Sequence, residues 1–445
     1  MGSKNLKALV SYGTRKVPVH DPKKFSQIVR EWNHLLKAHQ MTGSDLGNYG
    51  TALWVNRSNR HGILPTRNFQ KGRFEEAEKI SGEYLADNYL VRNSGCVSCP
   101  IRCERRVMLG NREIKGAEFE TIGLLGSNIE NSDLNLINEW NYHLDLLGID
   151  SISTGGTLAF AMELQERGIK DFGLKFGKTD NILEALYNIA YRRGEQGELA
   201  DGVKILSEKY GGEEFAIHSK GLELAAYDPR ISVGLGLGYA TANRGGCHLN
   251  AGYAALLEAL GPIPVPPTDL EAKPGLVVFL QNGMDAVSLG GSCVFTFMMM
   301  IPNPAFKIKE SSPLKPILGK GTLLSGGLLN NLGKMLPWII PININALLPH
   351  GEALYHATGI KMTMGKFLQA GERCFNMERL YNIREGLTGA DDSLPSRMTD
   401  QPLEPEREDT IVDLEKMLPV FYRARGWDEK GIPTSKKLKQ LKIDI

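Results

Sequence analysis

Three cysteines lie close together in one short stretch of the chain. Cys96, Cys99 and Cys103 are spaced Cys-x-x-Cys-x-x-x-Cys, so a single loop can place three thiolates around one inorganic centre. Thiolates this close would repel one another or oxidise unless a metal centre bound them. Zinc is one candidate, but structural zinc loops usually carry their cysteines in pairs. Three cysteines in one loop with a fourth from elsewhere are more typical of an iron-sulfur cluster, so the spacing favours iron-sulfur over zinc.

The length and charge of the chain limit the kinds of protein that it can be. At 445 residues the chain is too long for one ordinary core, so we expect two domains. With 52 basic and 51 acidic residues the net charge is +1, which gives no indication of a nucleic-acid or membrane partner. Clustered free cysteines need a reducing compartment, and the apolar run near the N-terminus is too short for a signal peptide. We therefore expect a cytoplasmic protein.

The most apolar stretch, residues 276–302, is long enough to cross a membrane. Gln281, Asn282 and Asp285 interrupt it, and glycines break its helical pattern. Polar and acidic side chains are costly in a bilayer. The stretch is therefore predicted to be a buried element of a large domain and not a membrane span.

Helical periodicity dominates the first 220 residues. Apolar spacing predicts helices over 22–39 and 132–147, the second ending at Gly148, a residue suited to a left-handed helix C-terminus. Residues 5–12 instead have the pattern of a strand that ends at Gly13. The first part of the chain is thus predicted to be mostly helical around the cysteine loop.

Residues 220–251 change in character, with few helix formers and many glycines. We interpret this stretch as the boundary between two mainly helical domains, 21–220 and 221–445. Glycine-rich backbone can lie close to a ligand. The segment Gly234-Leu-Gly-Leu-Gly238 is similar to a dinucleotide-binding turn, but it lacks the third spaced glycine and a clear following helix, which disfavours that interpretation.

Ordered motifs run along the whole chain. Besides the cysteine loop they are Gly62-Ile-Leu-Pro-Thr-Arg-Asn-Phe69, Ala117-Glu-Phe-Glu-Thr121, Gly148-Ile-Asp-Ser-Ile-Ser-Thr-Gly155, Tyr227-Asp-Pro-Arg230, Tyr239-Ala-Thr-Ala-Asn-Arg-Gly-Gly-Cys-His248 and Tyr381-Asn-Ile-Arg-Glu-Gly386. In these motifs the chain resembles the aldehyde ferredoxin oxidoreductases. Members of that family bind tungsten, or in some cases molybdenum, through pterin cofactors beside a 4Fe-4S cluster.

The resemblance implies a mainly α fold formed by domains 2 and 3 of the family. Residues 1–20 would then be a remnant of the family's N-terminal β domain, namely its last strand. The rest of that domain lies outside this sequence, and a separate polypeptide is one source for it. The resemblance also implies that Cys96, Cys99, Cys103 and Cys293 hold the cluster.

One pterin-binding motif of the family, Asp-x-x-Gly-Leu-Asp, is matched by Asp145-Leu-Leu-Gly-Ile-Asp150, with Ile149 in place of leucine. Gly148 lets the backbone approach a flat ring, and the two carboxylates can accept hydrogen bonds from ring N–H and amino groups. The alternative is that Asp145 and Asp150 only cap helix ends.

The second motif, Asp-x-x-Gly-Leu-Cys, is where this sequence departs from the family. Its positions hold Ser288-Leu-Gly-Gly-Ser-Cys293, so Ser288 replaces the aspartate, Ser292 replaces the leucine and Gly291 is kept. Asp285 lies three residues upstream and is a candidate replacement for the carboxylate. Because of this departure, an alternative function remains open: a non-catalytic electron-transfer subunit that keeps the iron-sulfur cluster but has lost the pterin.

The resemblance implies that a histidine and a glutamate act near the metal. His248 matches the histidine, and both Glu118 and Glu120 match the glutamate segment. The implied reaction is oxidation of a small aldehyde to a carboxylic acid, with electrons passed through the cluster to ferredoxin or another iron-sulfur carrier. The sequence does not fix the oligomeric state, for which a homodimer is one candidate. A reductase acting on an acyl or aromatic thioester is the alternative within the family.

Overall fold

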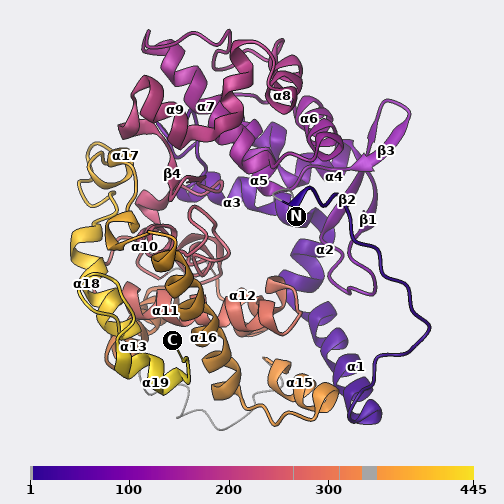
Figure 1. Ribbon diagram of the computed structural model, residues 1–445. Helices are drawn as coiled ribbons and strands as arrows, with labels where there is room; N and C mark the ends of the chain where they lie inside the picture. Colours follow the sequence, from indigo (N-terminus) through magenta and orange to yellow (C-terminus); the bar gives the residue numbers. More distant parts are fainter. Residues whose placement is uncertain (1–3, 264, 310, 333–347, 445) are drawn as a thin grey trace.

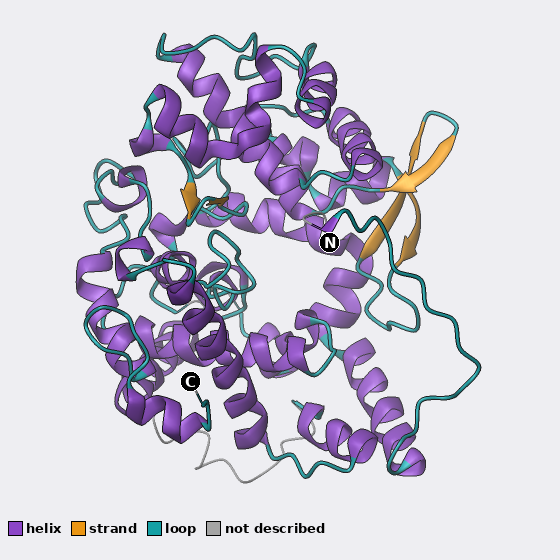
Figure 2. Cartoon of the chain, viewed as in Figure 1, coloured by secondary structure: helices purple, strands orange, loops and turns teal. Residues whose placement is uncertain are grey.

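The computed structural model describes residues 4–263, 265–309, 311–332 and 348–444. Helices make up most of it (Figures 1 and 2), which confirms the mainly α prediction. Two small antiparallel sheets complete the described part of the chain. One has the order β1-β2-β3 and the other pairs β4 with β5. Their strands are β1 Leu90–Ser94, β2 Glu104–Leu109, β3 Arg112–Lys115, β4 His218–Ser219 and β5 Leu222–Glu223.

The helices form three groups along the chain (Figure 1). The first contains α1 Pro22–Ala38, α2 Leu46–Tyr49, α3 Trp54–His61, α4 Gly82–Asn88 and α5 Phe119–Leu125. The second contains α6 Leu134–Leu147, α7 Ser151–Glu166, α8 Ile182–Tyr191 and α9 Gly202–Tyr210. The third contains α10 Val233–Thr241, α11 Lys273–Leu289, α12 Asn303–Phe306, α13 Leu314–Leu332, α15 His350–Thr358, α16 Met364–Arg384, α17 Ser396–Thr399, α18 Leu414–Arg425 and α19 Ser435–Leu441.

The second group has an apolar cluster of its own, formed by buried residues between Leu125 and Ala216. The largest cluster contains buried residues from both sides of residue 220, among them Ile122 and Leu235. A third cluster joins α10, α11 and α18 around Phe421. The division into domains at residue 220 stays a prediction.

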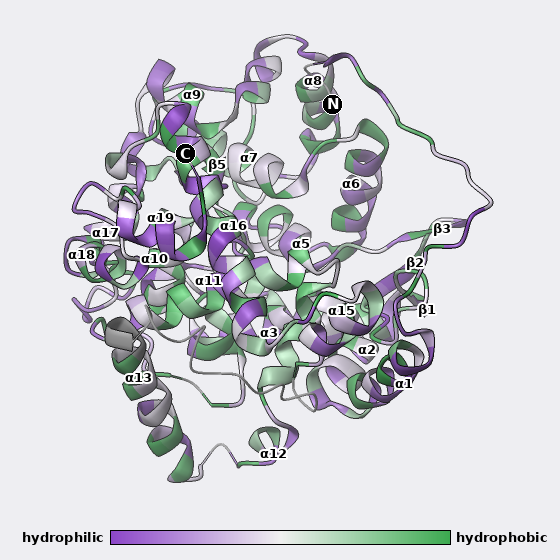
Figure 3. Ribbon diagram, turned by 60° about the horizontal axis from the view of Figure 1, so that its bottom comes forward, coloured by the Kyte–Doolittle hydropathy of each residue, from purple (hydrophilic) through white to green (hydrophobic). Residues whose placement is uncertain are grey.

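Helix α11 lies at the centre of the third group and is buried along most of its length. It packs against α10, α13, α16 and α18, and Figure 3 shows apolar residues concentrated on the central helices around it. Burial of this apolar segment inside the protein agrees with the interpretation of residues 276–302. Among the described residues, no helix combines the length and apolar character needed to cross a bilayer.

The junction of α6 and α7 follows from its capping residues. Asp133 caps the start of α6 by accepting hydrogen bonds from the backbone N–H groups of Asn135 and Leu136. Gly148 ends α6 with a φ of +70°, as predicted from the sequence. Asp150 then caps α7, which begins at once at Ser151. Two helices therefore meet at the first motif with only three residues, Gly148, Ile149 and Asp150, between them.

Two segments differ from the sequence predictions. Residues 6–19 form no strand with any described part of the chain, and Leu9, Val10 and Tyr12 are 82%, 90% and 95% exposed. A strand needs a partner edge for its backbone hydrogen bonds, and no described segment pairs with residues 6–19. Residues 233–241 are helical, although their glycines predicted irregular backbone.

The glycines of α10 serve close packing within the protein. A Cβ atom on Gly236 would lie 2.6 Å from the side chain of Val412, and one on Gly238 would lie 2.3 Å from the carbonyl oxygen of Ala251. Both glycines are therefore in close contact with other parts of the protein. Their lack of a side chain lets neighbouring segments approach a helix that is hydrophobic all round.

Candidate active site and metal centre

The cysteine loop connects β1 to β2. These strands pair from Leu90↔Val107 to Ser94↔Glu104, so the loop projects from a short hairpin. Ser98 and Arg102 in the loop have positive φ values of 62° and 52°. Arg105, which is 2% exposed, holds the loop by donating hydrogen bonds to the carbonyl oxygens of Arg102 and of Gly47, the latter at 2.8 Å.

Cys293 approaches this loop from the end of α11. Burial raises the pKa of the Cys103 thiol to about 12, and the charges of Glu118, Cys293 and Cys99 add to the rise. Burial also raises the pKa of Cys293, with further contributions from Cys99 and Cys96. The four predicted cluster cysteines are therefore close enough to interact electrostatically, and none forms a disulfide.

Four free thiols, three from one loop and one from the end of α11, are a donor set that a 4Fe-4S cluster or a tetrahedral zinc ion can use. No group of three or more His, Cys, Asp or Glu side chains among the described residues is arranged to hold one metal ion. Tetrahedral zinc needs all its sulfurs about 2.3 Å from one atom. A 4Fe-4S cluster instead spreads four thiolates over a larger centre.

Glu120 and His248 form a buried pair. Glu120 lies in the first turn of α5, and His248 follows the loop after α10. The Oε1 atom of Glu120 is 3.5 Å from Nε2 of His248, and the side chains are only 17% and 15% exposed. The backbone N–H of Ala226 donates a 2.7 Å hydrogen bond to Oε2 of Glu120, which fixes the carboxyl group.

Two tyrosines enclose the imidazole of His248. The ring centroids of Tyr227 and Tyr253 lie 5.6 Å and 5.5 Å from that of His248. Their hydroxyl oxygens are 2.9 Å apart and share a hydrogen bond. The pair is thus surrounded by aromatic surface, which lowers the local polarity and disfavours charged forms.

This environment shifts both titratable groups toward their neutral forms. Burial raises the pKa of Glu120 to about 8, helped by the charges of Asp150 and Glu118 and opposed by hydrogen bonds from Ala226 and Tyr227. Burial lowers the pKa of His248 to about 3, helped by the charge of Arg244. Between about pH 3 and pH 8 the site therefore holds a neutral carboxylic acid beside a neutral imidazole.

Two buried polar atoms of the pair have no hydrogen-bond partner within the described protein. They are Oε1 of Glu120 and Nδ1 of His248. Buried polar groups are rarely left unpaired, and an exception calls for an explanation. The pair is thus equipped to make hydrogen bonds to a bound molecule.

The structure separates the two glutamates of the Glu-Phe-Glu segment. Glu118 forms a 3.1 Å ion pair with Lys115, and its side chain is 44% exposed. Its charge acts on Cys103 and Cys293, whereas Glu120 pairs with His248. Glu118 thus lies toward the cysteines and Glu120 toward the buried histidine.

The two predicted pterin motifs end their helices in the same way. In α6, the N–H groups of Gly148 and Ile149 donate to the carbonyl oxygens of Asp145 and Leu144 at 3.3 Å and 3.1 Å. In α11, the N–H groups of Gly291 and Ser292 donate hydrogen bonds to the carbonyl oxygens of Ser288 and Val287 at 3.0 Å and 3.1 Å. The two glycines have φ values of +70° and +72°.

This shared geometry fixes the correspondence between the motifs. Ser288 takes the place of Asp145, Ser292 that of Ile149 and Cys293 that of Asp150. A Cβ atom on Gly148 or Gly291 would meet nothing within 4 Å, so both helix ends are open to an approaching group. Open backbone beside carboxylate and hydroxyl groups fits the flat, donor-rich edge of a pterin.

The carboxylates differ in their surroundings. Asp150 caps α7 by accepting a 2.8 Å hydrogen bond from the N–H of Ser153, and Asp145 is exposed. Asp285 is 8% exposed, and its Oδ1 accepts a 3.4 Å hydrogen bond from Asn250. Its Oδ2 has no partner within the described protein, and burial and the charge of Glu378 raise its pKa to about 7.

The sequence analysis assigned no role to Tyr227, Tyr253 or Arg105. Tyr227 lies in one of the motifs that carry the resemblance, and this is the signal that could have marked it. Tyr253 and Arg105 have no comparable signal, because their importance arises from contacts with residues distant in the sequence.

Comparisons with known proteins identify relatives of the chain. Residues 27–443 match the family model described as aldehyde ferredoxin oxidoreductase, domains 2 & 3. Tungsten-containing aldehyde ferredoxin oxidoreductases of Pyrococcus abyssi and Pyrococcus furiosus are each 38% identical to this chain, over 100% of its length and 68% of theirs. An aliphatic sulfonate oxidoreductase WOR-like subunit of Pyrococcus furiosus is 30% identical over 56% of this chain and 42% of its own length.

A solved structure shares the fold. It is the BamBC active-site complex of benzoyl coenzyme A reductase with 1,5-dienoyl-CoA, which matches with a TM-score of 0.62 at 18% identity. The match covers 97% of this chain and 66% of that one. On its family-model match and on the identity and coverage of these relatives, the chain belongs to the aldehyde ferredoxin oxidoreductase family.

Proposed function

We propose that this chain carries the active site of an oxidoreductase that converts aldehydes to carboxylic acids. The observation that supports this most strongly is the buried Glu120–His248 pair, whose unpartnered atoms lie in an aromatic enclosure. Glu118 acts electrostatically both on Glu120 and on Cys103 and Cys293, so the pair and the cysteine group both lie near the start of α5. A redox reaction at the pair would thus have an electron acceptor close by.

The reaction must balance oxygen, protons and electrons. The aldehyde carbon gains an oxygen atom from water, and two electrons and two protons leave. A tungsten or molybdenum pterin, when bound, supplies the redox centre for this change. Asp145, Gly148, Ile149 and Asp150 would hold one pterin. Ser288, Gly291 and Ser292, with the nearby carboxylate of Asp285, form the less regular second contact.

The chain's own residues bind the carbonyl group and handle protons. Neutral Glu120 donates a hydrogen bond to the carbonyl oxygen of the substrate and transfers its proton to that oxygen as negative charge develops there, as a carboxylic acid with a raised pKa can do. Neutral His248 forms a hydrogen bond to the substrate or to water at Nδ1, its unpartnered nitrogen. Tyr227 and Tyr253 exclude water from the pair. Cys96, Cys99, Cys103 and Cys293 would hold the cluster that passes electrons to ferredoxin or a similar carrier.

Metal content tests the proposal directly. Protein purified without oxygen should contain about four irons and about one tungsten or molybdenum per chain. Replacing Cys293 by alanine removes one ligand of the cluster and should lower the iron content clearly. Elemental analysis together with the visible absorption of the cluster measures both changes.

Cys374→Ala is the matched control, because this cysteine lies on α16 beside Glu378 and is not one of the four. Its iron content should equal that of the wild type. Zinc in place of iron, or equal iron in both variants, contradicts the assignment of the cluster. Four irons without either heavy metal instead supports an electron-transfer subunit, the candidate favoured by Ser288 in place of an aspartate.

The pKa of Glu120 predicts the pH dependence of the reaction. Glu120 is protonated below its pKa of about 8 and loses its hydrogen-bonding proton above it. We therefore expect kcat for aldehyde oxidation to be level near neutral pH and to fall as the pH rises through about 8. Steady-state rates with an artificial electron acceptor measure this profile. A rate that rises steadily from pH 7 to pH 9 contradicts the role of neutral Glu120.

A further inference from the structure

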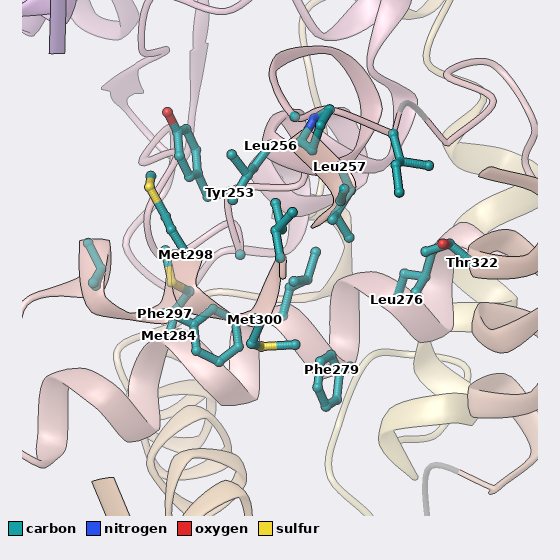
Figure 4. A pocket seen from close by; sticks show the side chains of 18 of the residues that line it. Tyr253, Leu256, Leu257, Leu276, Phe279, Met284, Phe297, Met298, Met300 and Thr322 are labelled. Atoms are coloured by element: carbon teal, nitrogen blue, oxygen red, sulfur yellow. The ribbon is translucent and has the colours of Figure 1, made fainter. Parts of the chain in front are cut away.

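The segment that follows Cys293 carries a single polar side chain, that of Thr296. This segment is η10, Val294–Met300, and its other six side chains are apolar. Most of them line an apolar cavity of about 360 Å³ (Figure 4). Thr296 does not line this cavity, although it is only 8% exposed. Its hydroxyl group therefore has its partners elsewhere in the protein.

Thr296 links the backbone of Cys293 to a buried histidine. Its N–H and its hydroxyl group both donate hydrogen bonds to the carbonyl oxygen of Cys293, at 3.0 Å and 2.6 Å. Its Oγ1 atom lies 3.0 Å from Nε2 of His350, which is 2% exposed. A hydroxyl group has one proton to donate, and that of Thr296 points to Cys293. Nε2 of His350 must therefore carry a proton and donate a hydrogen bond to Thr296.

Helices from distant parts of the chain enclose His350, the first residue of α15. Its ring stacks on Phe367 of α16 at a centroid distance of 5.3 Å and meets Trp32 of α1 edge-on at 4.5 Å. Phe367 also packs on the end of α11, where a Cβ atom on Gly290 would lie 3.5 Å from its ring. Burial lowers the pKa of His350 to about 4, so the imidazole is neutral near pH 7 and keeps one N–H.

The other ring nitrogen of His350, Nδ1, has no hydrogen-bond partner within the described protein. No described group there competes for the proton on Nε2. The hydrogen bond of this buried imidazole thus points in one direction, through Thr296 to the backbone of Cys293.

We propose that His350 is a positioning residue for the iron-sulfur cluster and acts through Thr296 on Cys293. This inference rests on the proposed function, in which Cys293 is a ligand of the cluster. The N–H and O–H dipoles of the chain both have their positive ends toward Cys293, and aligned hydrogen bonds strengthen one another. Hydrogen bonds around the ligands help to set the reduction potential of a cluster. Because reduction adds negative charge, the chain favours the reduced cluster and raises its reduction potential.

The reduction potential of the holoprotein, purified without oxygen, tests this role. His350→Phe keeps an aromatic ring against Phe367 but removes the N–H, so the midpoint potential of the cluster should fall. His350→Gln places an amide N–H near the position of Nε2 and should restore most of the wild-type potential. Titration with dithionite and mediator dyes, followed by electron paramagnetic resonance of the reduced cluster, measures these potentials on samples of equal iron content.

Thr296→Val and Thr296→Ser make the same comparison from the other end of the hydrogen bond, so either pair of variants decides the result. Valine removes the hydroxyl group and should lower the potential, whereas serine keeps it and should leave the potential unchanged. His39→Phe is the matched control. His39 is also buried, at 3% exposed, but its Nε2 donates a 2.8 Å hydrogen bond to the carbonyl oxygen of Ile301, beyond the end of η10. The potential of this variant should equal that of the wild type.

Equal potentials in the wild type, His350→Phe and Thr296→Val overturn the inference. An equal fall in His39→Phe, or a potential in His350→Gln as low as that in His350→Phe, also overturns it. Metal content separates the inference from the proposed function. If the wild type contains about four irons per chain but the potentials are equal, the cluster stands and this inference alone falls. If the wild type contains zinc or no iron, the proposed cluster falls and the inference falls with it.

Discussion

Replacing Glu120 by glutamine is expected to lower kcat for aldehyde oxidation by about 10²- to 10⁴-fold, the usual contribution of a group that transfers a proton. Glutamine keeps the size of the side chain and can still donate a hydrogen bond, so the variant removes the titratable proton in particular. The fall in rate near pH 8 should disappear with it. Steady-state kinetics across pH on protein of verified metal content measure both effects.

Glu118→Gln is the control for this result. Glu118 is two residues away in the same motif, but it pairs with Lys115 at 3.1 Å and is half exposed. Its replacement should change kcat little and should leave the pH profile in place. A larger loss in Glu118→Gln than in Glu120→Gln would reverse the assignment of the two glutamates.

Replacing Arg397 by methionine is expected to reduce the free energy of unfolding by about 3 kcal/mol. Arg397 donates two hydrogen bonds to Glu163, at 2.7 Å and 2.6 Å, and a third to the carbonyl oxygen of Asn68 at 2.8 Å. Glu163 is 1% exposed, so the change leaves a buried carboxylate with less compensation. We expect a loss of stability at the lower end of the range known for broken buried ion pairs, because Arg167 still donates a 2.7 Å hydrogen bond to Glu163.

Urea unfolding followed by far-ultraviolet circular dichroism measures this change. Arg407→Met is the control, since Arg407 also has two acidic partners, Glu404 and Asp409, but is 41% exposed. Such a surface pair should contribute no more than about 1 kcal/mol. Equal losses of stability in the two variants would show that burial of the Arg397–Glu163 pair does not matter.

The local parts of the site could be predicted from the sequence. The spacing of Cys96, Cys99 and Cys103 marked one loop, and Gly148 marked the end of α6, because both depend on neighbouring residues alone. The register of the second motif also followed from local spacing. Counting back from Cys293 placed Ser288 at the aspartate position, and the helix-end hydrogen bonds of α11 agree.

Other features could not be predicted, because they depend on contacts between distant segments. Local composition predicted irregular backbone over Gly234–Gly238, but packing of α10 against Val412 and Ala251 makes this stretch helical. The pattern of residues 5–12 predicted a strand, but a strand also requires a partner edge. Tertiary packing can thus override the helix propensity of a segment, and a segment with strand propensity forms no strand when it has no pairing partner.

The sequence by itself predicted the mainly helical fold, the cysteine loop and the helix end at Gly148, and its resemblance to the family added the candidate residues His248, Glu118 and Glu120. Only the tertiary structure decided which glutamate faces the histidine and that both members of the pair are neutral near pH 7. The physical reason is that burial and electrostatic environment are set by segments more than a hundred residues apart, whereas sequence spacing records only which groups lie side by side along the chain.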